Sequence, residues 1–363
     1  MNCPVSGEII PTLPPGGMWF SDMRCCRLES GGSGDDLRGA LGAEDAMKIH
    51  ITRQGFIQLL LLSIGLVILA YFILQSGIID NLWIITTISI PLFILAFLLS
   101  IANIGSKVYR WKYLSRYYYQ EISWYDASLV SISSLFFANI TPGKVGDLYK
   151  AYFMKRRYGM QFLDGVSMLF YERFFELTIL FLVAAGIVMI QLRAVTVIAL
   201  EFTLLVLFLL LVFYYKADFF MGLAEKVLVR LPIERREQGL NLHIRKMPPS
   251  QIVVVFLITL FSLVLEFARL WCVALAFGFL VNPIQLSIFM SLAFIIGLAS
   301  QIPLGVGAME GSLSYFITAM GVPSVTAIAI VLVDRMISMY FALVLGFVFS
   351  KLSLDALKDA VKD

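Results

Sequence analysis

The stretch TPGKVGDLYKAYFMKRR, residues 141–157, decides the fold because it ends an apolar segment that is too short to cross a bilayer. Only the thirteen residues 128–140 precede it without a charge, whereas a spanning helix needs about 20 apolar residues. Basic residues lie both before this segment, at 107–116, and after it, and basic loops stay on the cytoplasmic side of a membrane. We therefore predict that the chain enters the membrane, turns at 141–143 and returns to the same side.

The returning segment is predicted to be a helix that carries Lys150 and the basic cluster 155–157 to the cytoplasmic surface. Non-helical backbone at membrane depth is tolerated only where protein or a water-filled cavity surrounds it. A re-entrant turn at this place therefore predicts a cavity.

The composition agrees with a membrane protein. Of the 363 residues, 60% are hydrophobic and only 15% are charged, which is outside the range of soluble domains. The four cysteines and two histidines have none of the spacings that are typical of metal sites or disulfide frameworks. We expect no metal, no cofactor and no nucleic-acid partner.

Apolar stretches and basic flanks predict the topology. The basic residues place both termini and the loop 105–124 in the cytoplasm of a multi-pass protein of the cell membrane. The loop 216–249 is also basic, and it is either an interfacial amphipathic helix or a solvated connector. The predicted crossing segments are 56–74, 82–104, 161–192, 194–215, 251–280 and 322–350.

The chain divides into three parts by composition. Residues 1–47 are rich in Gly, Pro, Ser and Asp and are expected to be a disordered extension, or to precede a true start of translation at Met47. Residues 48–351 are expected to form one polytopic membrane domain, and 352–363 a cytoplasmic tail.

A second broken segment resembles the first. The apolar run 284–300 is interrupted by QIPLGVGAMEG, residues 301–311, and it must be entered from the outside for the tail to be cytoplasmic. Pro303-Leu-Gly-Val-Gly matches Pro142-Gly-Lys-Val-Gly at an offset of 161 residues. Later in each half, a glycine stands fourteen residues before an acid-arginine pair, Glu172-Arg173 or Asp334-Arg335.

These matches predict a duplicated unit with halves at about 82–192 and 251–350. Because the two broken segments enter from opposite sides, the halves have inverted topology, a plan that transporters use with a site at the repeat interface near the membrane midplane. The predicted fold class is an all-α integral membrane protein, a polytopic bundle with two re-entrant or broken helical hairpins in an inverted internal repeat. The turns are predicted at Pro142, Gly143, Gly146, Pro303, Gly305 and Gly307.

Arg173 and Arg335 are predicted to lie about 15 Å deep in the membrane, at 1.5 Å per helical residue. An unpaired charge there costs at least about 2.5 to 3.5 kcal/mol, so each arginine needs an acid, a ligand or water. One reading makes them buried ion pairs that fix helix packing. The other makes them phosphate ligands, since a guanidinium can hold an acid on one edge and a phosphate on the other. The candidate pairing acids are Glu172 and Asp334, each next to its arginine, Glu176, three residues beyond Arg173, and Glu310. Glu266 stands three residues before Arg269 and is expected to pair with it on one helical face.

Lys144 lies at the tip of the first turn, before a helix whose free N–H groups attract anions. We therefore predict a lipid-phosphate site made of Lys144, Arg173 and Arg335, without a catalytic residue. The weaker candidates are Asn139, Gln301, Glu266, Arg269 and Arg110.

Four motifs together resemble the flippase-like membrane proteins typified by the membrane half of bacterial lysylphosphatidylglycerol synthase. They are YRWKYL at 109–114, TPGKVGDLYKAYFMKRRYG at 141–159, LFYERFFEL at 169–177, and IPLGVGAMEG at 302–311 followed by Asp334-Arg335. The resemblance covers residues 47–350. It implies a membrane half that moves an anionic lipid between leaflets, without the cytosolic domain that makes the lipid.

The expected function is that of a lipid flippase-like transporter for an anionic phospholipid or a polyprenyl-phosphate-linked lipid. Its partners would be a membrane lipid with a phosphate head group and a separate lipid-modifying enzyme. The alternatives are a membrane-embedded transferase with Glu172 or Asp334 as general base, or an accessory subunit in lipid-linked sugar or aminoacyl-lipid synthesis. The sequence leaves the lipid, the direction of transport and the oligomeric state open.

Overall fold

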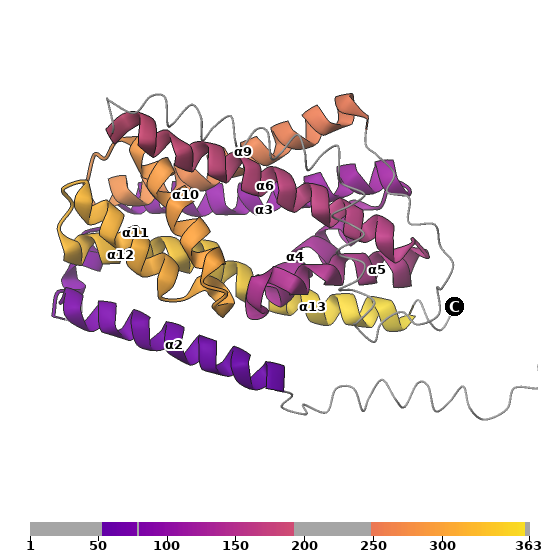
Figure 1. Ribbon diagram of the computed structural model, residues 1–363, viewed down its shortest axis with the longest axis horizontal. Coiled ribbons are helices and arrows are strands. Elements are labelled where there is room, and N and C mark those ends of the chain that lie inside the picture. Colours follow the sequence, from indigo (N-terminus) through magenta and orange to yellow (C-terminus); the bar gives the residue numbers. More distant parts are fainter. Residues whose placement is uncertain (1–52, 78–79, 192–247, 360–363) are drawn as a thin grey trace, which may run out of the picture. The chain divides into compact units, whose positions relative to one another are not determined.

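The computed structural model describes residues 53–77, 80–191 and 248–359 (Figure 1). The predictions for 1–47, for the crossing 194–215 and for nearly all of the loop 216–249 lie outside the described residues.

All regular elements among the described residues are helical, which confirms the predicted all-α class. Three of these helices are long and apolar enough to cross a membrane, at Ile90–Tyr118, Ser250–Ala276 and Ser324–Leu357. In chain order the elements are α2 (Arg53–Ser76), η1 (Leu82–Thr87), α3 (Ile90–Tyr118), α4 (Trp124–Ile140), η2 (Pro142–Asp147), α5 (Leu148–Tyr158), α6 (Phe162–Gln191), α9 (Pro249–Ala276), α10 (Pro283–Ala299), η3 (Pro303–Gly305), α11 (Ala308–Ala319), α12 (Ser324–Arg335), η4 (Met336–Tyr340) and α13 (Phe341–Asp359).

The two predicted breaks are 3₁₀ turns, η2 and η3, and their surroundings correspond. Each follows a helix of 17 residues, α4 or α10, and precedes a short helix, α5 of 11 residues or α11 of 12. The second residue after each proline is left-handed, with φ of 57° at Lys144 and 64° at Gly305. We call the segments 141–147 and 302–307 the first tip and the second tip.

Helices α3 and α9 pack against one another in opposite directions. At one end the Ser89 backbone N–H donates to the Ala276 carbonyl at 2.9 Å. In the middle the Asn103 amide donates to the Ser262 carbonyl at 2.6 Å, and at the other end the Tyr113 hydroxyl bonds the side chain of Gln251. The helices that precede the two broken segments are therefore antiparallel neighbours.

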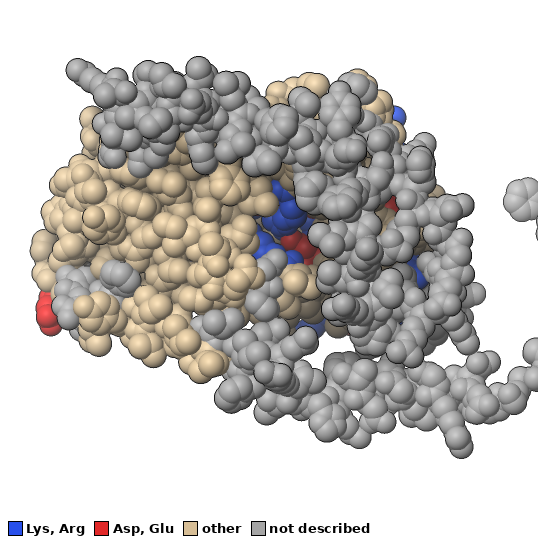
Figure 2. Space-filling model, in the orientation of Figure 1, with Lys and Arg blue, Asp and Glu red and all other residues tan. Residues whose placement is uncertain are grey.

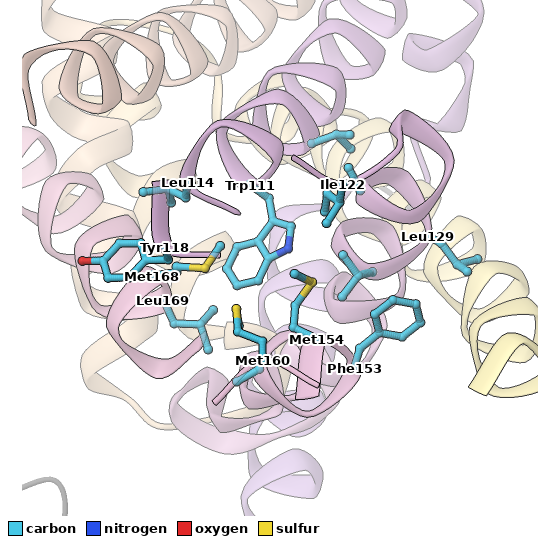
Figure 3. Close-up of a cluster of buried hydrophobic side chains, with 14 of the residues drawn as sticks. Trp111, Leu114, Tyr118, Ile122, Leu129, Phe153, Met154, Met160, Met168 and Leu169 are labelled. Carbon is cyan, nitrogen blue, oxygen red and sulfur yellow. The ribbon is translucent and has the colours of Figure 1, made fainter. Parts of the chain in front are cut away.

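Two large apolar cores lie within the described helices. One core joins α3, α4, α5 and α6 around Trp111, with Leu114, Phe153, Met154 and Met168 buried beside it (Figure 3). A second core joins α9 to α12 through residues such as Leu270, Leu286, Leu313 and Ile330. In Figure 1, α4, α5 and α13 gather toward one end of this bundle, and α10, α11 and α12 toward the other.

Helix α2 packs against the second tip without intervening side chains. A Cβ atom on Gly65 would lie 2.6 Å from the Val306 carbonyl oxygen, and one on Gly307 would lie 2.5 Å from the Gly65 carbonyl oxygen. Real Cβ atoms do not approach so closely, so both positions need glycine for this backbone contact.

Two predicted boundaries are wrong. Helix α3 does not end at 104 but continues to Tyr118, so most of the predicted loop 105–124 is helical. The last predicted crossing corresponds to α12 and α13 joined by the π-helical turn η4, and this helical segment extends to Asp359. Hydropathy marks where the chain stops being apolar, whereas these helices continue as amphipathic segments with buried residues such as Trp111 and Leu357.

Candidate functional site

A cavity of about 160 Å³ lies where the two tips face α3, α4, α6, α9 and the α12–η4–α13 segment. Figure 2 shows a recess in the described surface where Lys or Arg and Asp or Glu atoms lie together. Among the described residues, the charged side chains that line the cavity are Lys107, Arg110, Lys144, Asp147, Lys150, Glu172, Arg173, Glu176, Glu266, Arg269 and Arg335.

Glu172 of α6 joins two cations from other helices. Its Oε1 accepts from Arg110 of α3, and both of its oxygens accept from the ammonium of Lys150 of α5, at 3.1 and 2.9 Å. All three side chains are buried. The prediction that α5 carries Lys150 to the surface is therefore wrong, because this lysine turns inward to Glu172.

Asp334 of α12 is held in a similar way by Arg269 of α9. The Arg269 Nε donates to Oδ1 at 2.8 Å and Nη2 donates to Oδ2 at 3.3 Å. The two arginines are 159 residues apart and the two acids 162 residues apart, so the pair Arg110–Glu172 recurs as Arg269–Asp334. Each pair ties the helix before a broken segment to the helix after it, α3 to α6 and α9 to α12.

Neither acid pairs with the arginine next to it in sequence, contrary to the prediction. Consecutive helical residues point about 100° apart, so Glu172 and Arg173 face different neighbours. The predicted Glu266–Arg269 pair is also loose, at 4.0 Å, because Arg269 faces Asp334. Glu266 lies equally far from Lys107 of α3, at 4.0 Å.

Arg173 binds the first tip and still faces the cavity. Its Nη2 donates to Asp147, and its Nη1 donates to Glu176 at 2.6 Å. Its Nε has no hydrogen-bond partner, and 31% of its side chain is exposed. The predicted pairing with Glu176 is present.

Arg335 is enclosed to a greater degree. Its Nε donates to Glu310 at 2.8 Å, and its Nη1 donates to the Met309 sulfur at 3.2 Å. Its Nη2 donates to the Leu304 carbonyl at 2.7 Å and to the Met339 sulfur at 2.6 Å. Only 8% of this side chain is exposed. In the described conformation Arg335 therefore holds the second tip, and Arg173 is the more accessible arginine.

Both short helices after the tips start beside an acid from the chain itself. Asp147 is the N-cap residue of α5, and the Glu310 Oε2 accepts from the Gly307 N–H at the start of α11, at 2.7 Å. The positive end of a helix dipole attracts such acids. The predicted free anion receptor at the start of α5 is therefore already beside a carboxylate, which Arg173 binds in turn.

Lys144 belongs to the first tip and faces α10. Its ammonium lies 4.5 Å from the centre of the Phe294 ring of α10, a cation–π contact. No Asp or Glu oxygen of the described residues lies within 4.0 Å of this ammonium, whereas every other cation of the cavity lining has such a partner.

The remaining candidates surround the cavity or shape the tips. Asn139, Gln301 and Gly305 line the cavity, and Gly146 packs so tightly that its Cβ would lie 2.1 Å from the Phe137 carbonyl oxygen. Pro142 and Pro303 each begin a 3₁₀ turn, and Gly143 follows Pro142 in η2. The residues that sequence reasoning missed are Asn103, Lys107, Asp147 and Phe294.

A repeat signal in the sequence identifies part of what was missed. Lys107 and Glu266 are 159 residues apart, as are Asn103 and Ser262, and both pairs meet where α3 crosses α9.

No group of three or more His, Cys, Asp or Glu able to hold a metal ion occurs in the part of the chain that the structure describes.

Comparison with known proteins agrees with these observations. Residues 56–346 match the family described as the lysylphosphatidylglycerol synthase TM region. The chain is also similar to a UPF0104 membrane protein of Methanothermobacter thermautotrophicus, with 28% identity over 254 residues, which are 64% of this chain and 76% of that protein.

Proposed function

This chain belongs to the lysylphosphatidylglycerol synthase TM-region family, and from that premise we propose that it moves a lipid with an anionic phosphate head group between the leaflets of the cell membrane. The head group enters the cavity between the two tips, and the apolar tails remain in the bilayer. Lys144 and Arg173 contact the phosphate. Arg335 replaces its contact with the Leu304 carbonyl by a phosphate contact when the second tip moves.

One observation carries this proposal. Within a membrane protein, a cavity at the meeting point of two broken helices is lined by an ammonium without an acid partner and by an arginine side chain that is 31% exposed. Cations inside a membrane domain are costly, and they mark pathways for substrates. The ammonium is that of Lys144, and the exposed arginine is Arg173.

The antiparallel packing of corresponding helices supports an alternating-access mechanism. Helices α3 and α9 are antiparallel and meet at positions 159 residues apart, as is expected when two halves of inverted topology face one another. Each half has a tip and an arginine that binds beside it. The inverted halves would exchange conformations, so that the cavity opens first on one side of the membrane and then on the other.

The contacts give less support to a transferase. Glu172 and Asp334 were the candidate general bases, but all four of their carboxylate oxygens accept hydrogen bonds from buried lysine or arginine. A general base must have an oxygen within reach of a substrate proton.

Reconstitution tests the proposal. Purified protein in liposomes with labelled anionic phospholipid is expected to speed exchange between leaflets, and Arg173→Gln is expected to abolish the gain. Arg116→Gln is the matched control. The Arg116 side chain is 71% exposed, and its ion pair with Glu121 is long, at 3.9 Å. Size-exclusion chromatography checks that both variants remain folded. Exchange equal to that of empty liposomes, for every anionic lipid tried, would overturn the proposal.

A further inference from the structure

The positive and negative charges of the side chains around the cavity nearly cancel, and one positive charge remains. Seven cationic side chains line it, at 107, 110, 144, 150, 173, 269 and 335. Six acids accompany them: four that line the cavity, at 147, 172, 176 and 266, and two behind it, Glu310 and Asp334, which bind Arg335 and Arg269. The described cluster therefore carries one positive charge in excess.

The excess can be assigned to one side chain. Each of the six acids lies within 4.0 Å of at least one arginine or lysine. Lys144 lies outside these pairs, and its ammonium lies over the Phe294 ring. In a site of low polarity an unbalanced charge is expensive, whereas one added negative charge beside it restores the balance.

From this balance we infer that the lipid accepted by the cavity carries a single phosphodiester and no ammonium group, with a net charge of −1. The inference rests on the proposed function and adds the chemical class of the substrate. A phosphodiester has one ionised oxygen, which faces Lys144. Its second oxygen faces the exposed part of the Arg173 side chain.

The same balance disfavours three other head groups. A phosphomonoester carries a charge of about −1.5 to −2 at neutral pH and would leave the site negative. A zwitterionic lipid has no net charge, so it would leave the positive excess of the site unbalanced. An aminoacylated lipid of the kind in the family's name has the same difficulty, with more ammonium groups.

Two lipid types share the favoured chemistry. A glycerophospholipid such as phosphatidylglycerol and a polyprenyl-phosphate hexose both carry one phosphodiester and no ammonium. They differ in their tails and in the sugar, which the charge balance does not distinguish.

Binding in detergent tests the inference separately from transport. The stabilisation of the protein against heat is measured with five lipids: phosphatidylglycerol, a polyprenyl-phosphate hexose, phosphatidic acid, phosphatidylethanolamine and lysylphosphatidylglycerol. At least one diester is expected to bind about tenfold or more tightly than the last three, a ratio equal to about 1.4 kcal/mol. The first two arms show which source of the diester is preferred.

Charge variants sharpen the test. Lys144→Met makes the cluster neutral and is expected to abolish the diester preference, whereas Lys112→Met, outside the cavity, leaves it intact. Glu176→Gln adds one positive charge and is expected to shift the preference toward phosphatidic acid.

The two proposals fail in different ways. If phosphatidylethanolamine or lysylphosphatidylglycerol binds as tightly as the best diester, or if Lys144→Met keeps the diester preference, the inference is wrong whether or not lipids are exchanged. If diester selectivity is observed without any exchange in liposomes, the substrate class stands and the transport proposal fails.

Discussion

Replacing Glu172 by Gln measures how far this fold depends on its buried ion pairs. The Glu172 carboxylate binds both Arg110 and Lys150, and 3% of the Glu172 side chain is exposed. Removing one partner of a buried pair typically costs about 3 to 5 kcal/mol, because the charge left behind remains out of water. Glutamine keeps the shape and one acceptor oxygen, so we expect a loss near the lower figure, about 3 kcal/mol.

The chain supplies a matched control for this change. Glu121 binds Lys112 at 2.9 Å, the same distance as Glu172 to Lys150, but 54% of the Glu121 side chain is exposed. Screening by water makes such a pair weak, so Glu121→Gln is expected to leave stability nearly unchanged.

Equilibrium unfolding in mixed micelles, with the fraction of denaturing detergent as the variable, gives both free energies on one scale. Adding Lys150→Met to Glu172→Gln removes one of the two unbalanced cations and is expected to recover part of the loss. Equal losses for Glu172→Gln and Glu121→Gln would refute the reasoning, since they differ in burial and not in distance.

Two further predictions use the same unfolding measurement. Asp334→Asn leaves Arg269 without its carboxylate, and a loss of about 3 kcal/mol is expected; an unchanged midpoint would contradict the correspondence between the two pairs. Gly146→Ala places a Cβ 2.1 Å from the Phe137 carbonyl oxygen and is expected to destabilise the first tip. Gly105→Ala, with nothing within 4 Å, is expected to be neutral or stabilising by up to about 1 kcal/mol, and the reverse order of these two variants would show that the tip packs differently.

The sequence predicted the features that depend on local pattern. The breaks follow from proline and glycine inside apolar runs, and they occur within a residue or two of η2 and η3. The segment 161–192, predicted to cross the membrane, is observed as one helix, Phe162–Gln191. Helix ends were predicted less well, as α3 shows, because an amphipathic continuation does not change the hydropathy of the span itself.

Partners across helices were beyond that reasoning. Arg110, Glu172, Arg269 and Asp334 were all named as candidates, but acids were assigned to arginines one or three positions away. The actual partners are 62 and 65 residues apart, and only the packing of α3 on α6 and of α9 on α12 brings them together. Lys150 was misplaced for the same reason, since its burial depends on Glu172 and not on its own neighbours.

The contact between Gly65 and the second tip connects helix α2 to the charge cluster. Val306 and Gly307 touch α2 through their backbone, and two residues earlier the Leu304 carbonyl accepts from Arg335. A sliding or tilting of α2, such as a change in bilayer thickness would impose, is thus transmitted through four residues to a guanidinium at the cavity.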